Sequence, residues 1–401
     1  MDTVTHGLTG WLVARALPDK WKGEHPKIAT AVVAVGSVLP DADHAASLLG
    51  SEMYLRVHRG LSHSLLGITV SSLVMALLFA HFGKWKDAKR LFLLALVGQA
   101  SHVVLDLLNA YGTQVLQPFS DARLSLDLLF VVDLVFTGIV VAGIAWSRGG
   151  RAGPARIAIA TLAVYVGIAA LLHGRAVDLV RDAAVRSGIR VVAASALPRL
   201  PSVALPSADR FGFATPAAAS PAEKGRSGNR TAVERRVVPF PAGPFAWNGF
   251  VDDGRSFRRA EVAPLSGTLE WKQQEPRGAD VPAVRAILGV SDVKTYLWFA
   301  RFPVVHVTTD NGRTEVTFYD MRFSGMPGRR PFLLRVIETP GAPPLALWGS
   351  RGVVSDHEVR PARKISTSSG SRAAPRSTPI TRITSSGSYP LAYGRSDDIA
   401  S

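Results

Sequence analysis

Long apolar runs fill the first half of the chain, whereas apolar and polar residues alternate over much of the second half. A membrane-spanning helix needs about 20 mostly apolar residues. Four runs approach that length: Ser64 to Phe82, Leu91 to Leu108, Leu126 to Trp146 and Ala155 to His173. Two shorter stretches, His6 to Leu17 and Ile28 to Leu39, predict a helical hairpin packed against the longer spans. We therefore expect an α-helical integral membrane domain, with about four full spans plus this short N-terminal hairpin, over residues 1–175.

The second half of the chain predicts a soluble part. Residues 176–197 have helical spacing with apolar positions on one side, which predicts a connecting helix. Pro, Ala, Ser, Gly and Arg dominate residues 198–244, a composition typical of a disordered linker. Residues 245–352 predict a small antiparallel β domain, either a cover over the membrane part or a module that binds a partner, and residues 353–401 a disordered tail. The expected strands are Phe245 to Val251, Gly267 to Trp271, Ala283 to Leu288, Lys294 to Phe302, Val304 to Thr309, Thr314 to Phe323 and Pro331 to Glu338.

The distribution of charge predicts how the spans are oriented. The net charge of +15 raises the question of a nucleic-acid partner, but the basic residues are scattered through loops, so no nucleic acid is expected. The segments 83–90 and 147–156 hold four and three basic residues, whereas 109–125 holds only Arg123. Because cytoplasmic loops are enriched in Lys and Arg, we expect the first two segments in the cytoplasm. The opposite helix ends and the β domain are then expected outside it.

Titratable residues cluster in the membrane part. Seven of the ten histidines lie within the first 106 residues. Such side chains are costly near a bilayer and usually pair, bind an ion or do chemistry there. Taken alone, His102 and Asp106 could form a hydrogen bond between them that joins helices, because they lie four apart on one helix face. The predicted topology, however, places eight such residues at one membrane face: His6, Asp41, Asp43, His44, His58, His63, His102 and Asp106.

These eight residues predict a site for a divalent metal ion. The chain has no cysteine, so only imidazole and carboxylate ligands are available, and these suit zinc, with manganese or iron as alternatives. The number of ligands suffices for one or two ions. Water activated by a metal attacks esters and phosphoesters. We expect Asp43, Arg59 and Asp133 to take part in catalysis, with Arg59 binding a phosphate or carboxylate oxygen. A site at the bilayer surface favours a lipid-linked or amphipathic substrate, so membrane lipids are the expected partners.

Five motifs in fixed order connect residues 1–135 to a family. They are THGLTG, LPDADH, HRGLSHS, SHVVLDLLNAYG and QPFS, and the set resembles the YdjM-like family of membrane-bound metal-dependent hydrolases. The resemblance implies a multi-pass protein of a bacterial inner membrane with metal-dependent hydrolase activity. It implies metal ligation by His6, Asp41, Asp43, His58, His63, His102 and Asp106, with His44 supporting them.

The sequence also departs from the family and leaves one alternative open. In similar sequences the aspartate of the following span precedes a proline, whereas here Asp133 precedes Leu134, which puts the role of Asp133 in doubt. The alternative function is that of a non-catalytic membrane protein that binds metal in order to transport or sense ions. Transport favours ligands near the middle of the bilayer, and these residues are expected at one end of the spans.

Overall fold

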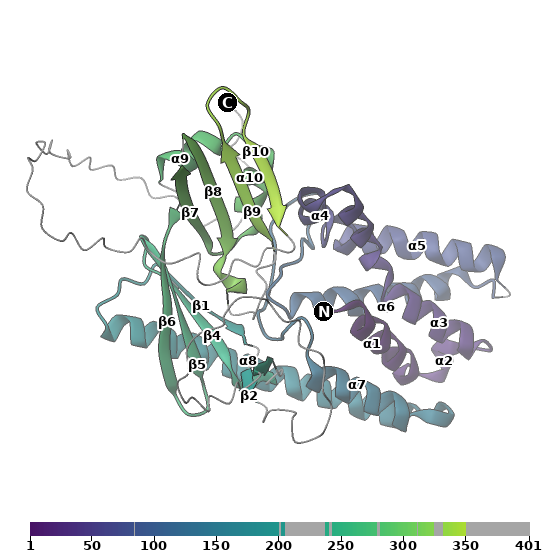
Figure 1. Cartoon of the computed structure of the whole chain (residues 1–401). Coiled ribbons are helices and arrows are strands. Elements are labelled where there is room, and N and C mark those ends of the chain that lie inside the picture. The colour runs from purple at the N-terminus through teal and green to yellow at the C-terminus, as the bar shows by residue number, and fades with distance from the viewer. Residues whose placement is uncertain are drawn as a thin grey trace, which may run out of the picture.

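The chain is described by a computed structural model over residues 1–83, 85–199, 202–204, 237–239, 243–278, 281–310, 312–324 and 332–349. Figure 1 shows helices α1 to α7 gathered on one side and two β-sheets on the other, with α8 extending from the first group to the second. The predicted fold class, membrane helices followed by small antiparallel sheets, is therefore confirmed.

The helices begin where the sequence offers a capping side chain. The side chains of Asp2, Ser64, Asp87 and Asp133 accept a backbone N–H from the first turn of α1, α5, α6 and α7, respectively. The helical elements are α1 (Thr3–Ala16), α2 (Asp19–Lys22), α3 (Pro26–Gly36), the 3-10 helix η1 (Leu39–Leu49), α4 (Ser51–Val57), η2 (Leu61–His63), α5 (Leu65–Phe82), α6 (Ala88–Leu107), α7 (Leu134–Trp146), η3 (Arg148–Gly150) and α8 (Ala152–Arg186).

Four helical segments of the described chain are long and apolar enough to cross a membrane: Pro26–Leu49, α5, α6 and α8. They differ in one member from the predicted four. The span predicted from Leu126 to Trp146 is too long, because residues 126–133 are not helical and α7 has only 13 residues. The stretch from Ile28 to Leu39, predicted as half of a short hairpin, instead belongs to a segment of 24 residues that combines α3 and η1.

Helix α8 joins the two parts of the molecule. It is continuous over 35 residues, a length of about 52 Å at 1.5 Å per residue. It includes both the span predicted to end at His173 and the first half of the separate helix predicted over 176–197, whereas residues 193–197 of that predicted helix belong to a strand. Its second half lies against a β-sheet, where Ala176 and Val180 pack with Trp247 in a buried cluster. The first half of the predicted connecting helix thus continues a candidate membrane span.

Two four-stranded antiparallel sheets form most of the remainder. The first has the order β1-β4-β5-β6, and the second has the order β10-β9-β8-β7. The strands are β1 (Ala193–Pro198), β4 (Trp247–Asp252), β5 (Ser256–Ala263), β6 (Thr268–Pro276), β7 (Pro303–Asp310), β8 (Arg313–Asp320), β9 (Leu333–Glu338) and β10 (Leu345–Gly349), and the 3-10 turns are η5 (Gly243–Phe245) and η7 (Met321–Phe323). A separate pair, β2 (Ser202–Ala204) and β3 (Val237–Pro239), lies inside the segment predicted as a disordered linker.

Two of the predicted strands are helices. The segment from Ala283 to Leu288 forms α9 (Pro282–Ile287), and most of the segment from Lys294 to Phe302 forms α10 (Ser291–Phe299). Buried residues recur in them at the three-residue spacing of a helix face, Val284 with Ile287 and Val293 with Tyr296. The alternation of aromatic residues in YLWFARF predicted the two-residue period of a strand, and this prediction is wrong. Most of the predicted linker and all of the predicted tail lie outside the described residues.

Candidate metal centre

Four parts of the chain bring the candidate ligands to one end of the helical bundle. Helices α1 and α5 begin at this end, whereas α3 and α6 finish there, so residues far apart in the sequence meet. Near the start of α1 lies His6; in η1 lie Asp41, Asp43 and His44; between α4 and α5 lie His58 and His63; and near the end of α6 lie His102 and Asp106. The structure thus brings all eight predicted metal residues together, in three groups whose ligand atoms lie within 4.8 Å of one another.

The innermost group consists of His63, His102, Asp41 and Asp106. The Nε2 atoms of the two histidines lie 3.0 Å apart. Oδ2 of Asp106 lies 3.3 Å from each of these nitrogens. Oδ1 of Asp41 lies 3.8 Å from the nitrogen of His63 and 3.6 Å from that of His102. Each of the two nitrogens therefore has both carboxylates as neighbours in the protein interior.

The protons on both imidazoles are fixed by groups behind them. Nδ1 of His102 lies 2.8 Å from the backbone carbonyl oxygen of Ser37, which can only accept, so this nitrogen carries the hydrogen. Nδ1 of His63 lies 2.9 Å from the hydroxyl oxygen of Ser62, whose own hydrogen is donated to Asp43, and 3.2 Å from Oδ2 of Asp43, so this nitrogen also carries its hydrogen. Each Nε2 is then left with its lone pair directed at the inner group, the arrangement that metal-binding histidines adopt.

The five separations that involve an imidazole nitrogen of the inner group are of the size that zinc ligands show. Ligands at the usual zinc bond lengths of 2.0–2.1 Å lie about 3.3 Å apart at the corners of a tetrahedron. The measured separations of 3.0–3.8 Å bracket this value. Oδ2 of Asp106 is buried without a hydrogen-bond donor, although two nitrogen lone pairs face it. Such a cluster of acceptors requires a proton or a metal ion between its members.

A proton is the alternative occupant of the inner group, and its affinity there is raised. Burial by itself lowers the pKa of His63, but the neighbouring carboxylates of Asp106 and Asp43 outweigh this effect and raise the pKa above its ordinary value. A divalent metal ion therefore competes with a proton for the same nitrogen.

Three nitrogen groups, among them the positively charged guanidinium of Arg59, already surround the second oxygen of Asp106. Its Oδ1 lies 2.9 Å from a guanidinium nitrogen of Arg59, 2.5 Å from the amino group of Met1 and 3.1 Å from Nε2 of His6. The ring of His6 also stacks on that of His102 at 3.6 Å. Since its two oxygens face different groups, Asp106 links the inner group to His6.

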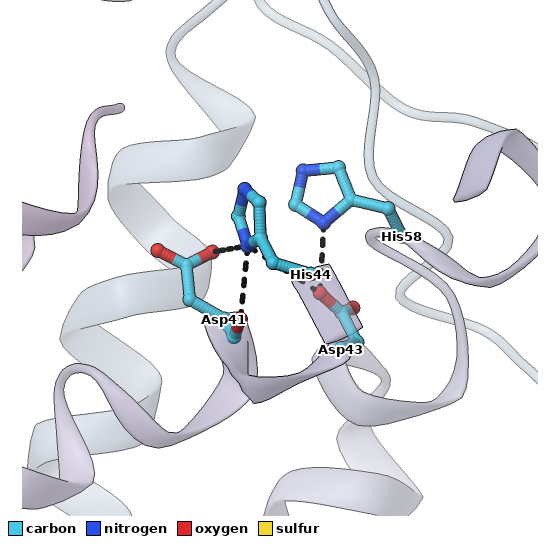
Figure 2. A group of neighbouring side chains, drawn as sticks. All are labelled: Asp41, Asp43, His44 and His58. Atoms are coloured by element: carbon cyan, nitrogen blue, oxygen red, sulfur yellow. Dashed lines mark hydrogen bonds and ion pairs between the residues drawn. The ribbon is translucent and has the colours of Figure 1, made fainter. Parts of the chain in front are cut away.

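A second group lies beside the first and nearer the surface. Figure 2 shows Asp41, Asp43, His44 and His58, with Nδ1 of His58 2.8 Å from Oδ1 of Asp43. The side chain of His44 is 47% exposed, whereas that of Asp43 is only 5% exposed. Burial lowers the pKa of His58 to about 4 despite the hydrogen bond to Asp43, so this imidazole is neutral near pH 7.

Asp43 holds other residues in place in this structure. Besides His58 and His63, the hydroxyl of Ser62 and the backbone N–H of Arg59 donate to it, at 2.6 and 3.1 Å. Four donors share its two oxygens. We therefore interpret Asp43 as the carboxylate that orients two histidines, while Asp41 directs an oxygen into the inner group.

The predicted catalytic residue Asp133 lies in a different environment. Its Oδ1 accepts the backbone N–H of Phe136 at the start of α7, and its Oδ2 accepts the hydroxyl of Tyr165 at 2.8 Å. It belongs to none of the three metal-capable groups found among the described residues. These contacts explain Asp133 as a helix cap and lend no support to a catalytic role.

Several contributors to the site were not predicted. Thr3 donates to Asp41 at 2.6 Å, and Asn109 accepts from Arg59 at 2.8 Å. Ser62 and Asn109 lie inside the motifs HRGLSHS and SHVVLDLLNAYG, so the motifs were the signal that could have identified them. Ser37 acts through its backbone carbonyl, for which no side-chain pattern exists.

The two four-stranded sheets, together with α9 and α10, form the β part of the molecule. This part lies over the same end of the bundle. Tyr111, whose ring lies 4.8 Å from the guanidinium of Arg59, packs against Phe299 of α10 at 5.1 Å. Arg301 forms an ion pair with Asp127 at 2.8 Å, across the junction between the two parts. Of the two predicted roles for the β domain, these contacts favour that of a cover.

Comparisons with known proteins find a match over the part of the chain that holds the site. Residues 1–176, which include all eight candidate ligands, match the family described as YdjM inner membrane protein. This region of the chain is similar to that family. The YdjM match ends within α8, so the sheets lie beyond it. Together with the apolar helices, it fits a multi-pass protein of the inner membrane.

The chain is also similar to the uncharacterized protein YfhP of Bacillus subtilis (strain 168). The two are 33% identical over 171 residues, which is 41% of this chain and 51% of YfhP. The chain thus spans about half the length of this curated relative. No solved structure matches the chain.

Proposed function

We propose that this protein is a membrane-bound hydrolase that uses a divalent metal ion, zinc in the first place, to hydrolyse an ester or phosphoester of a lipid-linked or amphipathic molecule. The observation that carries the proposal is the inner group, in which the unprotonated nitrogens of His63 and His102 face oxygens of Asp41 and Asp106. A metal ion bound there supplies Lewis acidity, which polarises water and the scissile group near neutral pH.

His58 is the proposed general base. Its Nδ1 donates to Asp43, so its Nε2 is the proton acceptor, and its pKa of about 4 keeps it neutral near pH 7. Because it belongs to the group next to the metal site, it can accept a proton from an attacking water. The more exposed ring of His44, 4.2 Å from that of His58, can pass this proton to solvent.

Arg59 is the proposed binding residue for an anionic substrate. Its side chain is 5% exposed and pairs with Asp106 and Asn109, but its Nε has no hydrogen-bond partner among the described residues. The guanidinium therefore retains one donor for a phosphate or carboxylate oxygen. The guanidinium of Arg59 also lies over the ring of Tyr111, and this contact holds the guanidinium in a single orientation.

The test is turnover of lipid esters and phosphoesters by the purified full-length protein, with and without a chelator. We expect hydrolysis of at least one class, loss of activity with chelator, and recovery when zinc, manganese or iron is restored. His58→Ala is expected to lower kcat roughly 100-fold or more, the usual effect of losing a general base. The matched control is His81→Ala, which alters an exposed histidine at the far end of α5.

Turnover that persists without metal would contradict the proposal. Bound metal without hydrolysis of any substrate would favour a transporter or sensor instead.

A further inference from the structure

An exposed apolar surface begins directly beside His44. We define the apolar rim as Leu48, Leu49, Met53, Val57, Leu61 and Phe119. All six are exposed, and Leu48, Leu49 and Phe119 are 86%, 75% and 87% exposed. The sequence between His44 and Glu52 contains no charged residue. Isolated exposed leucines are ordinary, but six exposed apolar side chains from neighbouring segments point to an interaction site.

Helix α4 carries exposed apolar side chains on one face and makes polar contacts with α10 on the neighbouring face. Met53 and Val57 lie four apart on one exposed stripe. Glu52 and Arg56 lie on the neighbouring stripe and contact α10, where the hydroxyl of Ser291 is 2.6 Å from Glu52 and 3.0 Å from Arg56. One stripe of α4 is therefore held by the β part, while the other remains without a protein partner among the described residues.

The rim continues into the lipid-facing surface of a candidate span. Leu61 is followed by Leu65 and Leu66 at the start of α5, which are 59% and 45% exposed. The segment that carries Phe119 lies alongside, since the backbone N–H of Leu65 donates to the carbonyl of Val115 at 3.0 Å. The rim thus lies at the level where α5 enters the membrane.

We propose that the apolar rim dips into the bilayer and forms a lateral entrance through which a membrane lipid places its headgroup at His44 and His58 while its acyl chains stay in the membrane. That the lipid is a substrate rests on the proposed function. The position of the rim in the bilayer does not. Acyl chains are the occupant that the observations favour, because the rim is continuous with a membrane-facing helix and carries no charge.

The absence of native cysteine allows a direct test of position. Single-cysteine variants Leu49→Cys and Phe119→Cys of the full chain would carry nitroxide labels in lipid nanodiscs. Val70→Cys within α5 serves as the membrane reference, and Leu265→Cys, in the β part and 63% exposed, as the water reference. Labels at 49 and 119 are expected to be accessible to oxygen and protected from a water-soluble nickel chelate, as at Val70. Accessibility like that of Leu265 would overturn the proposal.

A second measurement addresses the route of the substrate. Leu49→Lys is expected to lower turnover of a bilayer lipid about tenfold, because a charge weakens burial of the rim. Turnover of a water-soluble short-chain analogue should not change, and Leu265→Lys should affect neither. An equal loss with both substrates would overturn lateral entry. If the unaltered protein hydrolyses nothing, the proposed function fails, whereas the label accessibilities still decide the position of the rim.

Discussion

The proton positions on two imidazoles determine what the inner group can bind. The carbonyl of Ser37 accepts the Nδ1 hydrogen of His102, Ser62 and Asp43 together hold that of His63, and both Nε2 lone pairs then face the carboxylates. Asp41 and Asp43 lie two residues apart yet differ in role, because the latter is occupied by four donors. A metal ion or a shared proton satisfies the remaining acceptors, and this property makes the group a metal-site candidate.

Removal of a single inner ligand is expected to remove the metal. In His63→Ala or Asp106→Asn, three ligands or fewer remain, so bound metal measured by elemental analysis of purified protein should fall to a small fraction of the unaltered level. Asp106→Asn keeps the volume of the side chain and a partner for Arg59, which limits unfolding. His81→Ala should retain full metal content. Unchanged metal in both ligand variants would refute the site.

At the scale of elements, close packing of two helices positions a backbone group that orients one of the metal-binding histidines. The carbonyl of Ser37 reaches His102 because α3 and α6 approach each other at Gly98. A Cβ atom at Gly98 would lie 2.3 Å from the carbonyl oxygen of Val33 and 3.0 Å from the backbone nitrogen of Ser37. Small residues permit such approach between membrane helices.

Gly98→Leu is therefore expected to push α3 away from α6. Overpacking of this kind destabilises by roughly 1–3 kcal/mol, and the displaced Ser37 carbonyl should also weaken metal binding. The unfolding temperature and the metal content measure the two effects. Gly138→Leu on α7 is the matched control, because nothing lies within 4 Å of a Cβ atom there. Equal behaviour of the two variants would show that the close approach is unimportant.

The whole molecule has a polarity along its bundle. The turns that connect α5 to α6 and α7 to α8 lie at one end, and the candidate metal centre and both sheets lie at the other (Figure 1). Basic residues such as Lys86 and Arg148 occur at the first end. By the usual bias of membrane loops, we propose that this end is cytoplasmic and that the site and the sheets are extracytoplasmic.

Labelling of single cysteines tests this orientation. Ser266→Cys, on an exposed turn between β5 and β6, should react with a membrane-impermeant maleimide in intact spheroplasts. Lys86→Cys, also exposed, should react only after the membrane is opened. The reverse pattern would place the site in the cytoplasm. The native chain contributes no background, since it contains no cysteine.

The sequence by itself determined the features that depend on neighbouring residues. Apolar length predicted three of the four candidate spans, α5, α6 and the first half of α8, and capping side chains such as Asp87 mark where helices begin. The eight metal-capable residues were identified by type and by motif, because imidazole and carboxylate groups near a membrane have few other uses.

Only the tertiary structure decided what each of those residues contacts. The pairing of His63 with His102, the orienting role of Asp43 and the cap made by Asp133 depend on atoms from segments far apart in the sequence. The same reason explains why α9 and α10 were predicted as strands, since a short apolar or aromatic segment suits a strand until burial against other elements selects the helical period. Long-range packing also set Phe299 of α10 against Tyr111 beside the site, a contact that no local pattern predicts.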